Sequence, residues 1–140
     1  MSIDNTKKIL VTGSGGIGGV NFVRALKIFS DKFFIVGTDF NKYYLQFGDL
    51  DHREISPRHS DPNFIPLLNN LIEKYNIDFL HPQPSSEALI ISQNLEKIST
   101  KTFNTIVTNS NFLKDLVLKK YMLNPNKVRR VYKAIDIESL

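Results

Sequence analysis

The chain contains no cysteine, so it can form no disulfide, thiolate nucleophile or zinc–thiolate site. It has only three histidines, His52, His59 and His81. No two of them have the i, i+4 spacing with which a helix presents a pair of metal ligands. The sequence therefore gives no reason to expect a metal site or a metal cofactor.

Long hydrophobic runs are also missing. No apolar stretch approaches the roughly 20 residues that a membrane-spanning helix needs. The first six residues, Met1-Ser2-Ile3-Asp4-Asn5-Thr6, lack the apolar core of a secretory signal. We therefore expect no membrane span and a cytoplasmic location.

Two common catalytic patterns are absent. None of the five tyrosines is followed four residues later by lysine, so the Tyr-x-x-x-Lys acid–base pair of short-chain dehydrogenases is missing. The serines at 14, 85 and 86 have no nucleophile-elbow context, which removes support for a hydrolase triad. We predict no catalytic residue in this chain.

The most informative feature that is present is a glycine-rich turn. The apolar run 8–12 leads directly into five glycines within seven residues, and an amphipathic helical pattern follows. The turn fits Gly-x-Gly-x-x-Gly at Gly13, Gly15 and Gly18. Such a turn brings helix N–H groups towards an anion above it, because glycine has no Cβ to block close approach.

A second apolar run, 33–38, ends at Asp39, about where a dinucleotide-binding domain places its ribose-binding acid. The fourth strand-like run, 77–81, delivers His81 to the same predicted edge of the sheet. The residues predicted to form a cofactor-binding site are Gly13, Ser14, Gly15, Gly16, Ile17, Gly18, Asp39, His81 and Ser85.

Each of these residues also has a structural interpretation, and the sequence leaves both open. The glycines can serve close packing of strand against helix, and Asp39 can cap the turn that follows it. His81 is more often a hydrogen-bonded structural residue than a catalytic one. Tyr43 and Tyr44 can stack on a ligand ring or pack within the protein. If a ligand binds, a bulky residue at position 15 is expected to abolish binding and leave the fold intact.

Strand-like and helical patterns alternate along the whole chain. We expect strands near residues 7–12, 33–38, 53–56, 77–81, 105–108 and 127–132. Helices are expected over 16–29, from Asp61-Pro62 to Tyr75, from Ser85 or Ser86, and from Ser110. The pattern predicts one α/β domain: a three-layer, doubly wound, Rossmann-like parallel sheet of about six strands, in the order 3-2-1-4-5-6.

Residues 7–103 resemble the N-terminal domain that precedes the ATP-grasp fold in carbamoyl-phosphate synthase large-chain-like proteins. The resemblance rests on an ordered set of segments: Ile9–Gly16, Val36–Asn41, Asp61–Ile65, Ile77–Pro84 and Ser86-Glu87. It implies a Rossmann-like scaffold that helps to shape a substrate site. The lid and nucleotide-binding core of that family have no counterpart here, so ATP-dependent ligase chemistry does not carry over.

Residues 104–140 resemble the end of the N-terminal domain of GT-B glycosyltransferases. Thr105–Lys114 is similar to a strand and helix of that family, and Asn126–Asp136 is similar to its last strand before the interdomain linker. Lys133-Ala134 replaces the usual Asn-Gly of that linker. The donor-sugar site of that family lies largely in a second domain, so sugar transfer does not carry over either.

Charge changes at the same point of the chain. Residues 1–100 carry ten Lys/Arg against eleven Asp/Glu, whereas residues 101–140 carry eight against three. A composite chain, fused or recombined, is one explanation, and a single diverged family is the other. The basic residues at 119, 120, 127, 129, 130 and 133 come without an aromatic stacking pattern, so nucleic acid is not the expected partner.

The predicted function is a non-catalytic Rossmann-like scaffold without an intact active site. The alternative is a module of an ATP-grasp-type ligase or an NAD(P)-dependent enzyme. Such a module would bind a nucleotide or small phosphorylated ligand at the glycine turn and be completed by another chain. No particular cofactor and no oligomeric state follow from the sequence.

Overall fold

The computed structural model describes residues 6–29, 33–98, 106–108, 119 and 128–130. The chain divides into two compact units, residues 1–102 and 103–140. In chain order the elements of the first unit are β1 (Lys7–Thr12), α1 (Ile17–Phe29), β2 (Phe33–Asp39), the 3-10 helix η1 (Tyr44–Gln46), β3 (His52–Ile55), α2 (Phe64–Tyr75), β4 (Phe79–Pro82), α3 (Ser85–Gln93) and the 3-10 helix η2 (Leu95–Lys97).

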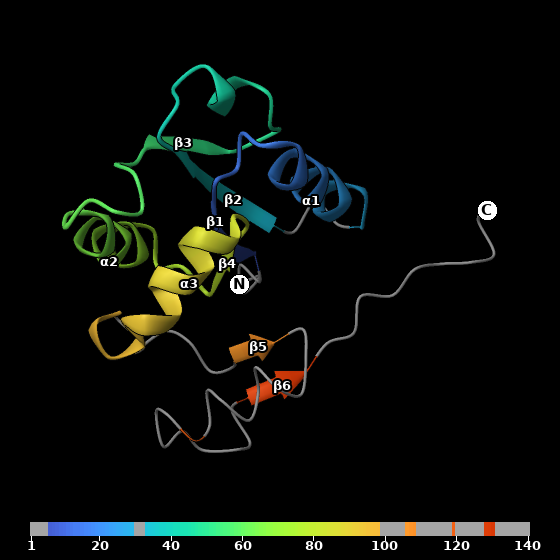
Figure 1. Cartoon of the computed structure of the whole chain (residues 1–140). Coiled ribbons are helices and arrows are strands. Elements are labelled where there is room, and N and C mark those ends of the chain that lie inside the picture. Colours follow the sequence, from blue (N-terminus) through green and yellow to red (C-terminus); the bar gives the residue numbers. More distant parts are fainter. Residues whose placement is uncertain (1–5, 30–32, 99–105, 109–118, 120–127, 131–140) are drawn as a thin grey trace. The chain divides into compact units, whose positions relative to one another are not determined.

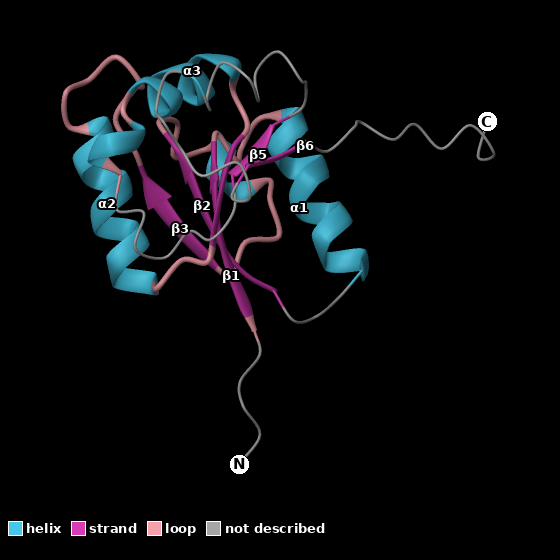
Figure 2. Ribbon diagram, turned by 90° about the horizontal axis from the view of Figure 1, so that it is seen from below, coloured by secondary structure: helices cyan, strands magenta, loops and turns pink. Residues whose placement is uncertain are grey.

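The first unit is built on a parallel sheet with the strand order β3-β2-β1-β4 (Figure 1). Val11 in β1 lies opposite Gly37 in β2 and His81 in β4. Helices connect these strands in alternation, and Figure 2 shows α1 and α2 on opposite sides of the sheet. The predicted α/β class and the order 3-2-1-4 of the first four strands are confirmed.

Alternating side chains of the central strands give the sheet two apolar faces. On the α1 face, Ile9, Val11 and Ile35 are buried with Val23 of α1. On the other face, α2 buries one side of its amphipathic pattern, namely Phe64, Leu68, Leu71 and Ile72. Both faces are therefore covered, and the carboxyl ends of the strands remain the place where loops meet.

Two element boundaries differ from the sequence prediction. The helix expected from Asp61-Pro62 begins instead at Phe64. Asp61 opens a turn ahead of the helix: its carboxylate accepts the N–H of Asn63 at 2.8 Å, and its carbonyl accepts the N–H of Phe64. The acid thus satisfies backbone donors before the helix, rather than serving as the helix N-cap.

The strand expected over 77–81 is β4, Phe79–Pro82. Its start is displaced because Asn76 adopts a left-handed conformation that ends α2, and the Ile77 N–H then donates back to the carbonyl of Ile72. Pairing with β1 begins only at Asp78, whose N–H donates to the carbonyl of Lys8 at 2.8 Å.

The second unit contains the short strands β5 (Ile106–Thr108) and β6 (Val128–Arg130), which pair in parallel with Ile106 opposite Val128. These strands lie within the two spans predicted for residues 105–108 and 127–132. The helix predicted from Ser110 falls outside the described residues. Lys119 is exposed, Arg129 and Arg130 lie in β6, and the other basic residues singled out above, Lys120, Lys127 and Lys133, fall outside the described part of the chain.

Candidate functional site

The glycine turn follows β1 and is tied to the neighbouring strand. Gly13 adopts a φ of +58°, a conformation that favours glycine. The N–H of Ser14 donates to the Thr38 carbonyl at 2.9 Å, and the Ser14 hydroxyl donates to the same oxygen at 3.2 Å. The turn is therefore fixed on β2 before α1 begins at Ile17.

Asp39 lies at the end of β2 and is only 4% exposed. Its Oδ2 accepts the N–H of Gly15 at 3.2 Å, and its Oδ1 accepts the N–H of Asn41 at 2.9 Å. Of the two roles that the sequence left open, the structure shows the capping role. The carboxylate also occupies an N–H of the glycine turn that a phosphate would otherwise use.

The lack of a side chain at Gly15 allows a close approach, but the group that approaches is the Tyr44 backbone of this same chain. A Cβ placed on Gly15 would lie 2.5 Å from the carbonyl carbon and 2.7 Å from the carbonyl oxygen of Tyr44. Because η1 packs this tightly on the turn, a bulky residue at position 15 would disturb the fold. The expectation that such a change would remove only ligand binding is therefore wrong.

The other glycines of the turn also face protein atoms. A Cβ on Gly13 would meet the Pro84 ring, with its Cδ at 2.5 Å, and one on Gly18 would meet the amide side chain of Gln83. Gly16 is the exception, because the nearest atom to its added Cβ is the Gly13 carbonyl oxygen at 3.6 Å. Gly16 and the neighbouring Ile17 are exposed.

Arg53 of β3 holds the segment that lies on the glycine turn. Its guanidinium donates to three backbone carbonyl groups, those of Leu45 at 3.0 Å, Gly48 at 2.9 Å and Leu50 at 3.0 Å. Only a planar, forked donor can reach all three acceptors at once. This one side chain therefore ties η1 to the loop that follows it, in addition to the burial of Leu45 in the core.

Arg53→Lys is expected to destabilise the fold by about 1 kcal/mol, because an ammonium group cannot replace all three hydrogen bonds. Amide hydrogen exchange is expected to accelerate most at Tyr44–Phe47. Urea unfolding and exchange measured by NMR test this, with Arg58→Lys as a control because Arg58 lies over the Phe40 ring. Equal exchange protection of η1 in both variants would contradict this role.

His81 faces α1 rather than the glycine turn. Its ring stacks on Phe22 with a centroid separation of 3.7 Å and an interplanar angle of 11°. Its Nε2 lies 2.9 Å from Oε1 of Gln83. Burial lowers the pKa of His81, and the contact with Gln83 opposes this shift. The ring is thus a packed, neutral group at pH 7, and Ser85 is an exposed residue at the start of α3.

The sequence did not single out Glu87 as a site residue, although it is a buried acid in the first turn of α3. Glu87 is 5% exposed, and its Oε2 has no hydrogen-bond partner among the described residues. Burial raises the pKa of this carboxyl group and the charge of Asp39 raises it further, whereas the neighbouring Thr12 hydroxyl and His59 lower it. The only signal for Glu87 in the sequence is that it is an acid in the first turn of the helix that follows β4.

Unpartnered polar groups cluster at the carboxyl edge of the sheet. Besides Glu87, the buried hydroxyl groups of Thr12, Thr38 and Ser56 have no hydrogen-bond partner among the described residues. Thr12 and Thr38 are register partners at the ends of β1 and β2, and Ser56 follows β3. Groups of this kind usually hold ordered water, because an unsatisfied buried polar group is costly.

Two buried acidic side chains flank the turn. Asp39 accepts the N–H of Gly15 on one side, and Oε2 of Glu87 would lie 3.5 Å from a Cβ on Gly13 on the other. A negative ligand placed above the turn would therefore meet two buried acids.

Comparison of this chain with protein-family models, curated proteins and solved structures finds no match. Among the described residues, no group of three or more histidine or acidic side chains is placed to hold a metal ion. No helix in the described part of the chain has the length and apolar character needed to cross a membrane.

Proposed function

We propose that this chain is a non-catalytic Rossmann-like scaffold domain, of the type that precedes the ATP-grasp fold. The observation that carries this proposal is the packing of the glycine turn: Tyr44 lies on Gly15, Pro84 lies on Gly13, and Asp39 accepts the Gly15 N–H. In a dinucleotide-binding turn the second glycine, which is Gly15 here, lets the backbone approach the ligand, and the other two serve the turn and its packing. Here the glycines serve contacts within the protein, so the turn supports a fold rather than a cofactor site.

The proposal extends to the whole chain. In it, β5 and β6 continue the sheet to the order 3-2-1-4-5-6, and the chain is a cytoplasmic composite of an ATP-grasp-type part and a glycosyltransferase-type part. Two observations support the composite. The compact units divide between residues 102 and 103, and the net charge changes near residue 100.

The expected result is that the purified chain gains no thermal stability from NAD(H), NADP(H), ATP, UDP-sugars or inorganic phosphate. A ligand at 100 times its Kd would stabilise the fold by about 2.7 kcal/mol, which raises the Tm of a domain of this size by roughly 10 °C. Differential scanning fluorimetry measures this directly. A saturable rise in Tm with any of these compounds would refute the scaffold proposal.

The alternative is a nucleotide- or phosphate-binding module completed by a second chain. It is favoured by one observation, the exposure of Gly16 and Ile17 at the start of α1, where the N–H groups of the first turn lack intrahelical partners. In this alternative Gln83, which covers Gly18, must move aside. The same screen separates the two functions, because only the alternative predicts stabilisation by an anionic ligand.

A further inference from the structure

The outer face of α1 carries an apolar stripe that the fold leaves uncovered among the described residues. Ile17, Val20, Arg24 and Ile28 recur at helical spacing along this face. Ile17 is 84% exposed and Ile28 is 77% exposed, whereas Val23, on the side of the helix that packs on the sheet, is buried. A helix that served only to cover the sheet would present polar residues to solvent here.

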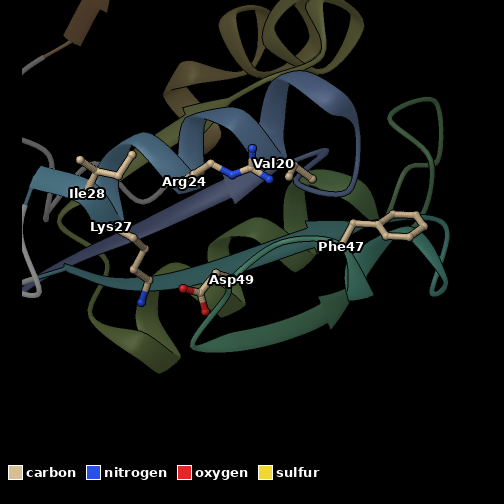
Figure 3. A pocket seen from close by; sticks show the side chains of 6 residues that line it. All are labelled: Val20, Arg24, Lys27, Ile28, Phe47 and Asp49. Carbon is tan, nitrogen blue, oxygen red and sulfur yellow. The ribbon is translucent and has the colours of Figure 1, made fainter.

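A groove runs beside this stripe, between α1 and residues 47–49 (Figure 3). One hollow of about 320 Å³ is lined by Val20, Arg24, Lys27, Ile28, Phe47 and Asp49. A second, of about 210 Å³, shares Val20 and Phe47 with the first and reaches Gly15, Ile17 and Asn21. The two hollows therefore form one continuous surface along most of the helix, and exposed Phe47 borders both of them.

The charges along the groove are of both signs, and only some of them are paired among the described residues. Lys27 pairs with Asp51 at 2.9 Å. In contrast, no ion pair or hydrogen bond engages the side chains of Arg24 and Asp49 in the part of the chain that the structure describes. Figure 3 shows Arg24 extending along α1 towards Val20 and Asp49 on the opposite side of the groove.

A surface with an apolar stripe and one unpaired charge of each sign is complementary to itself. In a two-fold dimer the same patch serves both partners, so Arg24 of each copy can face Asp49 of the other. Residues 1–100, which carry this surface, have nearly balanced charge and therefore little mutual repulsion. Aromatic residues and arginine are also the side chains most enriched at protein interfaces.

We infer that the groove between α1 and residues 47–49 binds a second copy of this chain about a two-fold axis. Ile17, Val20, Ile28 and Phe47 form the apolar contact, and two reciprocal Arg24–Asp49 pairs fix the register. This inference is independent of the proposed function, because a scaffold and a ligand-binding module can each dimerise through this face.

Charge reversal tests the pairing. Analytical ultracentrifugation is expected to show a concentration-dependent dimer for the unmodified chain. Arg24→Asp and Asp49→Arg are each expected to weaken it at least about tenfold, because each creates two like-charge pairs. A one-to-one mixture of the two variants, and the double variant, are expected to recover the dimer. Glu73→Arg, on exposed α2 surface, is the matched control and leaves the dimer unchanged.

Disulfide cross-linking provides a second test that needs no charge-reversed variant. Because the chain has no cysteine, Arg24→Cys mixed with Asp49→Cys is expected to form a heterodimeric disulfide under mild oxidation, and Glu73→Cys is not. A chain that stays monomeric up to about millimolar concentration, where a Kd of that order would be visible, overturns the inference. The inference is equally overturned if both charge-reversal variants dimerise as strongly as the unmodified chain. It is also overturned if the Arg24→Cys and Asp49→Cys chains form no disulfide with each other.

Discussion

Gly15→Ala is expected to destabilise the fold by about 3 kcal/mol, the upper end of the usual cost of overpacking. The added methyl group would lie 2.5 Å and 2.7 Å from backbone atoms of Tyr44, which cannot rotate away as a side-chain tip can. Relief requires η1 to move, and η1 is held by the burial of Leu45 and by the hydrogen bond from Arg53 to the Leu45 carbonyl. Urea unfolding monitored by circular dichroism gives the free energy of unfolding.

Gly16→Ala is the matched control, one residue further along the same turn. Its added methyl group has no atom closer than 3.6 Å, and Gly16 does not have the positive φ of Gly13. Its effect is expected to stay within about 0.5 kcal/mol. Equal effects of the two substitutions would show that Tyr44 does not press on Gly15, and the account of a closed turn would fail.

Glu87→Gln is expected to stabilise the fold at pH 7 by roughly 1–3 kcal/mol, because a neutral amide avoids the cost of burying an ionised carboxylate. Burial raises the pKa of Glu87 in the folded state, so the folded protein holds this proton more tightly than the unfolded chain does. The contribution of Glu87 to stability is then full below its unfolded-state pKa, and it is lost as the pH rises through the higher folded pKa.

The variant removes this pH dependence, so the stability difference between the variant and the unmodified chain is expected to grow as the pH rises above about 4.5, the ordinary pKa of the group. Urea unfolding between pH 4 and pH 8 measures it, with Glu73→Gln on the exposed side of α2 as the control. A constant difference across this range would mean that Glu87 titrates as an ordinary surface acid in the folded protein.

The first four strands and the helices between them could be predicted from the sequence, because each is a strong local pattern. The run Ile9–Val11 is continuously apolar just before Thr12 and the glycines, and α2 repeats its buried residues at helical spacing. The order 3-2-1-4 then follows from alternation and right-handed crossovers. The ends of elements were less predictable, because Asp61 and Asn76 act through local hydrogen bonds that resemble either a cap or a turn.

The character of the site could not be predicted in the same way. Residues 40–50 have no hydrophobic period, so nothing in them indicates that the Tyr44 backbone lies on Gly15, about thirty residues earlier in the chain. The glycine pattern is the same whether a ligand or a loop fills the space above it. Glu87 was visible as a first-turn acid, but its burial depends on packing against Thr12 and Gly13, which only the folded sheet reveals.

An NMR titration of the isotope-labelled chain tests most directly whether the glycine turn is closed by the protein itself. ATP, NAD⁺ and inorganic phosphate are each added while the amide resonances of Gly13–Gly18, Asp39 and Asn41 are followed. These resonances are expected to remain in place, because Asp39 and η1 already occupy the turn. Saturable shifts at Gly15, Gly16 and Gly18 with any of the three compounds would contradict the account and establish the turn as a ligand site.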